Sequence, residues 1–127
     1  MRNSLRLGVV SGIPIAIHWS IVLIAGVFGL ALAGTILPAA APGYVAGAYF
    51  VTATVVTVAL LASIVAHELG HSVVAQRNAV DVGGITLFAL GGVAKLEREP
   101  DTPGAAARIA IAGPAVSIAI GVAALAT

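Results

Sequence analysis

The sequence predicts an all-α membrane protein with about three transmembrane helices and a small β hairpin between the second and third. Of its 127 residues, 60% are hydrophobic and only 9% are charged, and the mean hydropathy is +1.11. A water-soluble domain of this length needs many more surface charges. The chain also contains three long apolar segments, and a polar segment with β-forming residues separates the last two. We interpret residues 1–127 as one membrane-embedded unit.

The first predicted span covers residues 13–37, which carry no formal charge. A helix needs about 20 residues to cross the hydrocarbon core, so this segment is long enough. The basic start of the chain is similar to that of a secretory signal, but no small-residue cleavage site follows a short apolar core. We therefore expect a retained helix. Two prolines and a glycine in residues 37–43 then predict a tight connection outside the membrane.

The second predicted span covers residues 44–76, and the third covers residues 105–127 with Gly113-Pro114 near its beginning as a kink or packing point. Between them, residues 78–104 form a polar excursion that holds every acidic residue except Glu68. In this excursion, β-forming residues lie on both sides of the pair Gly91-Gly92. They predict a short hairpin near the membrane surface.

The positive charges of the chain all fall on one side of the predicted membrane topology. None lies in the connection at 37–43, and all precede the first span or surround the polar excursion: Arg2, Arg6, Arg77, Lys95, Arg98 and Arg108. Because Lys and Arg in short loops favour the cytoplasmic side, we expect a multi-pass protein of the lipid bilayer with a cytoplasmic N-terminus and excursion. These scattered charges form no clustered basic face, which excludes nucleic-acid binding.

The candidate chemistry lies near the end of the second span, in the sequence His67-Glu68-Leu69-Gly70-His71. Histidines four residues apart project from one helix face and can bind one metal ion. Glu68 lies too far round the helix to be a third ligand, and it is placed to act as general base on metal-bound water. The chain has no cysteine, so any metal must be held by histidine and carboxylate.

Glu68 is the only carboxylate in the three apolar segments. Placing an ionisable group at membrane depth costs at least about 2.5 kcal/mol, so such a residue is a functional candidate. The alternative is that Glu68 and the histidines form a polar cluster that only joins helices. Small residues join helices without this cost, so the functional interpretation is favoured.

Four segments, in this order, resemble the site-2 proteases, which are membrane-embedded zinc proteases that cleave membrane-spanning substrates. Residues 12–20 resemble the opening of the family's first helix, residues 67–71 its zinc motif, residues 91–94 its glycine-pair strand and residues 109–114 the start of its next core helix. The resemblance covers nearly the whole chain. It implies a prokaryotic cell membrane protein, and the distribution of Lys and Arg predicts that its active site lies toward the cytoplasm.

The resemblance also implies the roles of the site residues. His67 and His71 are expected to bind one zinc ion per chain, and Glu68 is expected to activate water for hydrolysis of peptide bonds in membrane-spanning protein substrates, in regulated intramembrane proteolysis. The polar excursion is expected to lie near the substrate as an edge strand. An unwound substrate helix can recover its lost backbone hydrogen bonds by pairing with such an edge.

Two positions depart from the family pattern. The third zinc ligand of the family is an aspartate on a further helix, and nothing from Gly113 onward matches it, so the sequence supplies two of the three protein ligands that a catalytic zinc normally has. We expect the missing ligand beyond residue 127 and weak zinc binding without it. Ala106 stands where a glutamate is common. The other carboxylates fit solvated turn charges better than substitute ligands: Asp81, Glu97, Glu99 and Asp101.

His18 precedes Trp19 in the first predicted span, and this pair fits a hydrogen-bonding anchor at the membrane interface. A zinc-binding role for His18 is the less favoured alternative, because no partner lies at ligand spacing. The rival to the protease function is a non-catalytic membrane binding or regulatory protein with an incomplete zinc site. A water-soluble zinc protease fits poorly, because its motif helix would not end a long uncharged segment.

Overall fold

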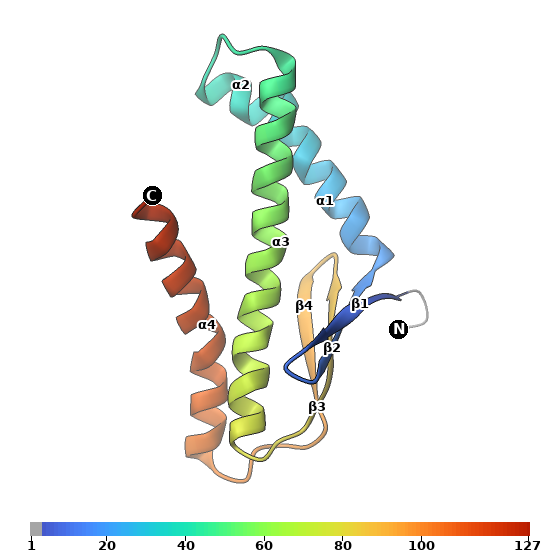
Figure 1. The fold of residues 1–127 in the computed structure, drawn as a ribbon, viewed down its shortest axis with the longest axis vertical. Helices are drawn as coiled ribbons and strands as arrows, with labels where there is room; N and C mark the ends of the chain where they lie inside the picture. Colours follow the sequence, from blue (N-terminus) through green and yellow to red (C-terminus); the bar gives the residue numbers. More distant parts are fainter. Residues whose placement is uncertain (1–3) are drawn as a thin grey trace.

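The computed structural model describes residues 4–127 and contains three long apolar helical segments beside a four-stranded sheet (Figure 1). The segments that are long and apolar enough to cross a membrane are Trp19–Ala40, Ala46–Arg77 and Pro103–Leu125. The prediction of about three such helices is confirmed. Arg2, one of the charges used to predict the membrane orientation, lies outside the described residues.

The first span begins later than predicted, because its first residues form a strand. Ile13–His18 is strand β2, and helix α1 begins only at Trp19. The prediction that residues 12–20 open the first helix is therefore wrong for most of this segment. Buried Ile13 and Ile15 alternate with less buried residues, which is the period of a strand with one covered face. In the sequence, a continuous apolar run does not distinguish such a strand from the start of a helix.

His18 links the strand to the helix. Its Nδ1 lies 2.7 Å from the hydroxyl oxygen of Ser20 and accepts a hydrogen bond from the Ser20 backbone N–H at 3.3 Å, so the imidazole caps α1 (Trp19–Ala31). The Ser20 hydroxyl also accepts a hydrogen bond from the backbone N–H of Ala89 at 3.0 Å. His18 thus joins the sheet to the first span, as a local hydrogen-bonding anchor.

The connection between the first two spans is shorter than predicted. The first span continues from α1 through the π-helical segment η1 (Leu32–Ile36) and α2 (Leu37–Ala40). Pro38 lies close to the end of this continuous helical span, two residues before Ala40. The turn follows at residues 41–45, and Gly43 takes a φ of +98° there that favours glycine. The Tyr49 hydroxyl donates to the Ala41 carbonyl at 2.7 Å and closes the turn.

Helix α3 (Ala46–Arg77) is the central element of the molecule, and at 32 residues it is about 48 Å long. Helix α4 (Pro103–Leu125) packs along the end of α3 that carries the His67 to His71 motif (Figure 1). The two helices approach closely at Gly70, where a Cβ atom would lie 2.9 Å from the Ala112 carbonyl oxygen. Gly113-Pro114 falls in the middle of α4 rather than near its beginning.

The sheet contains four strands in the order β1-β2-β3-β4, so the prediction of a single small hairpin in an otherwise all-α fold is wrong. The predicted hairpin does form between the second and third spans, as β3 (Val82–Phe88) and β4 (Gly91–Leu96). Its turn lies at residues 89–90, and both glycines of the Gly91-Gly92 pair belong to β4.

A second hairpin, made of β1 (Ser4–Val10) and β2, extends this sheet. Strand β2 pairs in parallel with β3 and places Ile15 opposite Ile85. Both side chains are at least 94% buried, as are those of Ile13 and Leu87. The shared apolar face explains why the two hairpins join, because each alone would leave these residues exposed.

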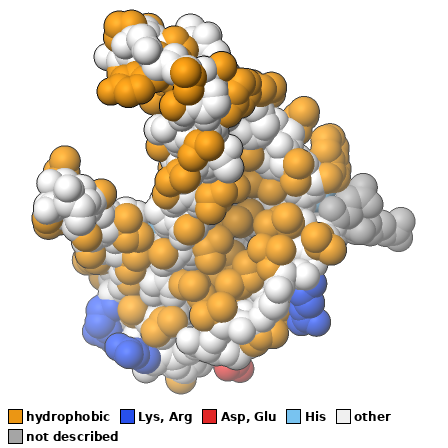
Figure 2. All heavy atoms as spheres, turned by 45° about the horizontal axis from the view of Figure 1, so that its top comes forward, with side chains coloured by type: hydrophobic (Ala, Val, Ile, Leu, Met, Phe, Trp, Pro, Cys, Tyr) orange, Lys and Arg blue, Asp and Glu red, His pale blue; other side chains and the backbone are white. Residues whose placement is uncertain are grey.

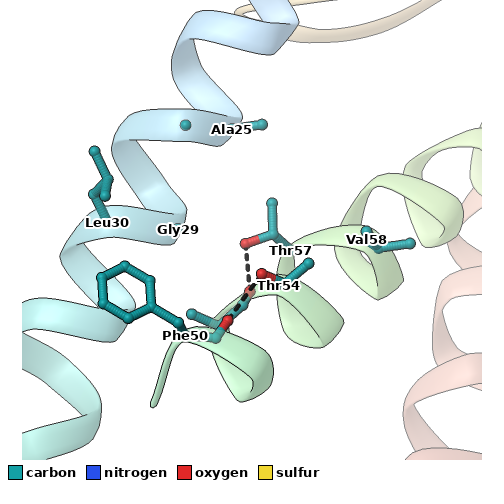
Figure 3. Close-up of a pocket in the computed structure, with 9 residues that line it drawn as sticks. Ala25, Gly29, Leu30, Phe50, Thr54, Thr57 and Val58 are labelled. Atoms are coloured by element: carbon teal, nitrogen blue, oxygen red, sulfur yellow. Dashed lines mark hydrogen bonds between the residues drawn. The ribbon is translucent and has the colours of Figure 1, made fainter. Parts of the chain in front are cut away.

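The upper part of α3 packs against α1, and a shallow hollow of about 360 Å³ lies between them (Figure 3). Gly29 and Thr57 face each other here, and a Cβ atom at Gly29 would lie in ordinary contact, 3.4 Å from the Thr57 hydroxyl oxygen. Thr57 donates to the Ala53 carbonyl at 2.7 Å and Thr54 to the Phe50 carbonyl at 2.8 Å. These hydroxyls satisfy carbonyls of their own helix, which is how threonine is accommodated in a membrane span.

Candidate metal centre

His67 and His71 come together on the face of α3 that meets α4. Their Nε2 atoms lie 3.2 Å apart, and their rings are nearly perpendicular, at 78°. Two nitrogen ligands at about 2.0–2.1 Å from a tetrahedral zinc ion lie about 3.3–3.4 Å from each other. The spacing of the two nitrogens therefore fits a shared metal ion, and imidazole nitrogen is a ligand that zinc prefers.

Helix α4 orients both imidazoles through their other ring nitrogens. The Nδ1 of His71 lies 2.6 Å from the Ile109 carbonyl oxygen, and the Nδ1 of His67 lies 2.7 Å from the Ser117 hydroxyl oxygen. A carbonyl can only accept, so the His71 Nδ1 carries the hydrogen and its Nε2 presents a lone pair. Such outer partners fix the ring and the tautomer of metal-binding histidines.

Gly113 makes room for both imidazoles. It is buried in α4, and a Cβ atom at this position would lie 2.6 Å from the Cε1 of His71 and 2.7 Å from the Nε2 of His67. Real Cβ atoms are essentially never this close to other heavy atoms. Ile109, Gly113 and Ser117 are spaced four residues apart and therefore lie on one face of α4. Ile109 and Ser117 bond to the two imidazoles, and Gly113 between them leaves space for the rings.

We expect Gly113→Val to weaken zinc binding, because the new side chain occupies the space of the Nε2 atoms that would bind the ion. The expected loss is at least the roughly 10- to 100-fold that follows removal of an outer partner of a metal ligand. Zinc affinity measured by competition with a chelator checks this. The matched control is Gly121→Val on the same helix, where a Cβ atom meets nothing within 4 Å. Equal affinities of the two variants would contradict the role of Gly113.

Glu68 follows His67 on α3 and lies beside strand β4. A Cβ atom on Gly92 would lie 2.7 Å from the Glu68 Cγ and 3.3 Å from its Cδ, so the absence of a side chain at Gly92 leaves the space that Glu68 occupies. Within residues 4–127, the Glu68 carboxylate forms no ion pair and no side-chain hydrogen bond. Its oxygens are therefore free to accept a hydrogen bond from water.

No third metal ligand joins the two histidines within the described residues, where no group of three His, Cys, Asp or Glu side chains could hold a metal ion. Asp101 forms an ion pair with Arg98. The backbone of Glu97 bonds to that of Asp81 at the base of the β3–β4 hairpin. Ala106, in the first turns of α4, offers no ligand atom. Residues 4–127 thus bring together two imidazole nitrogens with the spacing of metal ligands.

The motif predicted the two histidines and Glu68, but not the residues that position them. The pairing of His67 with Ser117 joins residues 50 apart in the chain, and His71 contacts a backbone carbonyl, which no side-chain pattern marks. Gly113-Pro114 gave the one usable signal, as a predicted packing point. The approach of Gly92 to Glu68 follows from the sheet, which the sequence revealed only in part.

Comparison with known proteins adds independent findings. Residues 55–127 match the profile of Peptidase family M50. A provisionally assigned zinc metalloprotease of Mycobacterium tuberculosis, Rip3, is 46% identical over 120 residues, which cover 94% of this chain and 30% of that protein. A zinc metalloprotease of Methanocaldococcus jannaschii is 35% identical over 123 residues, or 96% of this chain and 32% of that protein. The chain spans about a third of the length of these relatives.

The chain is also similar to a solved structure, the site-2 protease from Methanocaldococcus jannaschii. The TM-score is 0.64 and the sequence identity is 34%, and the match covers 94% of this chain and 49% of that one. The similarity extends well beyond the five-residue motif and includes the helices and strands around it.

Proposed function

The chain belongs to Peptidase family M50, the site-2 protease family, and we propose that His67, Glu68 and His71 form the zinc-binding and catalytic part of an intramembrane metalloprotease. The observation that carries this proposal is the 3.2 Å separation of two imidazole nitrogens that α4 holds in position. Bound zinc would supply the Lewis acidity that makes water deprotonate near neutral pH.

Each residue of the motif has a separate task in this proposal. His67 and His71 hold the ion through their Nε2 atoms, and their Nδ1 partners keep the rings from turning away. The Glu68 carboxylate takes the proton of the attacking water. It then delivers that proton to the amide nitrogen that leaves when the peptide bond breaks. One carboxylate can do both because the proton returns to substrate within the same cycle.

The third protein ligand comes, in this proposal, from outside the described residues. Those residues hold no third ligand beside the histidine pair, and a catalytic zinc site normally has three protein ligands and one open position. The relatives are about three times as long as this chain, so they have further segments that could supply one. Activity is therefore proposed for the protein at its natural length.

The substrate we propose is a membrane-spanning protein that pairs with β4 as an extended strand. The motif lies on a helix that can cross the membrane, β4 is an edge strand of the sheet, and Gly92 of β4 contacts Glu68. A substrate strand along this edge would lie beside the motif. The added strand would replace the backbone hydrogen bonds that a substrate helix loses on unwinding.

We expect Gly92→Val to reduce cleavage by at least about tenfold while zinc content stays unchanged. The valine side chain would occupy the position of the Glu68 Cγ and push the carboxylate away, whereas the two imidazoles lie on the α4 side of α3. Cleavage of a membrane-spanning peptide and zinc per chain are measured on the same preparations. The control is Val93→Ala, an exposed neighbour in the same strand. Unchanged cleavage in Gly92→Val would refute the role of Gly92 in leaving space for the Glu68 carboxylate.

We also propose that the sheet end of the molecule faces the cytoplasm in a prokaryotic cell membrane. Arg77, Lys95, Arg98 and Arg108 all lie at or beside this end, and Lys and Arg favour the cytoplasmic side.

The chain lacks cysteine, so a single introduced cysteine reports the orientation directly. An impermeant maleimide added to intact cells should label Ala41→Cys and should label Glu99→Cys only after permeabilisation. The opposite pattern would show an inverted orientation.

A further inference from the structure

A groove runs along the seam between α3 and α4 and changes from basic to apolar along its length. Two adjoining hollows form it, and they share Val74 and Ala112. The hollow at the end of α3, about 490 Å³, is also lined by Arg77, Asn78 and Arg108. The other, about 510 Å³, continues into the apolar part of both helices and has only Ala, Val, Leu and Gly in its lining.

The two arginines at the basic end lack an acidic partner. Within residues 4–127, no Asp or Glu side chain lies within 4 Å of Arg77 or Arg108, and both arginines are exposed. Arg77 is the last residue of α3, and Arg108 lies in the second turn of α4. The end of a membrane span is the depth of lipid headgroups, so these guanidinium groups can meet phosphate.

Asn78 holds the Arg108 guanidinium in place. The Asn78 Oδ1 accepts hydrogen bonds from Nη2 at 2.7 Å and from Nε at 3.3 Å, and the Asn78 Nδ2 donates to the Val74 carbonyl at 2.8 Å. Arg108 thus commits two of its five N–H donors and keeps three for another acceptor. An arginine held in this way loses less conformational freedom when it binds an anion.

We propose that this groove binds an anionic phospholipid, with the phosphate at Arg77 and Arg108 and an acyl chain along the apolar part of the seam. The arginines match the phosphate of such a lipid, and the apolar hollow matches its acyl chain. A free phosphate would use only the arginines, and an uncharged lipid would use only the apolar hollow. Figure 2 shows Lys and Arg side chains in two separate places along the lower part of a surface that is otherwise largely hydrophobic. A basic pocket between membrane helices is a known kind of site for anionic headgroups.

The position of the groove links lipid binding to the zinc site. Its lining includes Gly70 and Ala112, where α3 and α4 approach closely, and the neighbouring residues His71 and Gly113 belong to the candidate metal centre. A lipid lying along this seam would stabilise the helix pair that orients both imidazoles. The proposal does not depend on hydrolysis, because it concerns binding alone.

The test compares phosphatidylglycerol and phosphatidylcholine of identical acyl chains, added to the purified protein in neutral detergent and measured as retained lipid by native mass spectrometry. Each arginine at a membrane surface is worth about a fivefold preference for the anionic lipid, so we expect about 25-fold for the pair. The double variant Arg77→Gln/Arg108→Gln should bind both lipids about equally. Arg6→Gln, which changes one charge on strand β1 far from the groove in the chain, should keep the preference.

A second variant tests the apolar part. Ala115→Phe fills the groove but keeps both arginines, and it should weaken retention of both lipids. Equal retention of the two lipids by the unaltered protein, or a preference that survives the double variant, would overturn the proposal. Displacement of phosphatidylglycerol by an equal concentration of glycerol phosphate would show a phosphate site instead of a lipid site. A second protein chain bound with no lipid would show that the groove is a helix interface.

Discussion

Replacing Glu68 by glutamine should reduce peptide hydrolysis by about 10²- to 10⁴-fold, the contribution expected of a positioned general base. Glutamine has nearly the same shape as glutamate, but its amide accepts no proton from water. Zinc content should stay unchanged, because the two imidazole Nε2 atoms, and not Glu68, converge on a common point. The measurement is cleavage of a membrane-spanning peptide by the protein at its natural length, with zinc determined on the same sample.

The matched control for Glu68→Gln is Glu97→Gln, which removes a carboxylate from the exposed end of the β3–β4 hairpin. It should leave both zinc content and cleavage unchanged. Full activity of Glu68→Gln would show that another group accepts the proton. Loss of zinc together with activity would show that Glu68 binds the metal, and the separation of roles within the motif would then be wrong.

Replacing either His67 or His71 by alanine should strongly reduce zinc binding. Within the described residues, these two side chains are the only ligands brought together, so one replacement halves the donor set that this chain supplies. The loss of affinity should exceed the roughly 10- to 100-fold that follows removal of an outer partner. Zinc per chain, measured after dialysis against a weak chelator, should fall well below that of the unaltered protein, and cleavage should fall with it.

His18→Ala is the control for both histidine variants. His18 caps α1 through Ser20 and contacts neither of the motif histidines, so its loss should leave zinc content unchanged. The His18→Ala substitution should instead lower the free energy of unfolding by about 0.5–2 kcal/mol, the usual contribution of a helix cap. Zinc loss in His18→Ala equal to that in His71→Ala would contradict the assignment of the two ligands.

The helices of the fold could be predicted from the sequence because their signal is local. Uncharged runs longer than about 20 residues mark membrane spans whatever surrounds them. The second span was predicted as 44–76 and observed as Ala46–Arg77, and the third was predicted as 105–127 and observed as Pro103–Leu125. The predicted and observed ends differ by two residues or fewer. The observed ends are set by Val45, Asn78 and Thr102, which lie at helix caps with non-helical backbone angles.

The sheet could be predicted only in part, because strand pairing is not local. Ile13–His18 is an uncharged, largely apolar segment like the helix that follows it, and it is a strand because it pairs with β1 on one side and with residues 85–87, about 70 positions away, on the other. Strand β1 carries Leu5, Leu7 and Val9 at alternate positions, which is a strand pattern, but all three are exposed. For this reason the first span, predicted from hydropathy as residues 13–37, wrongly included strand β2.

The site shows the same division between local and distant information. Helical spacing alone brings His67 and His71 onto one face, so the motif was sufficient to predict that these two side chains come together. The partners of their Nδ1 atoms come from α4, and the space for their rings comes from the missing side chain of Gly113. These features depend on how two helices pack, which a single sequence does not specify.

Zinc K-edge X-ray absorption on the protein at its natural length tests the central claim most directly, because it reports the atoms bound to the ion. We predict two imidazole nitrogens at about 2.0–2.1 Å, and no sulfur from this chain, which has no cysteine. The imidazole signal should fall in both His67→Ala and His71→Ala. A zinc ion without imidazole ligands, or a protein that binds no zinc, would contradict the account and favour a non-catalytic regulatory protein.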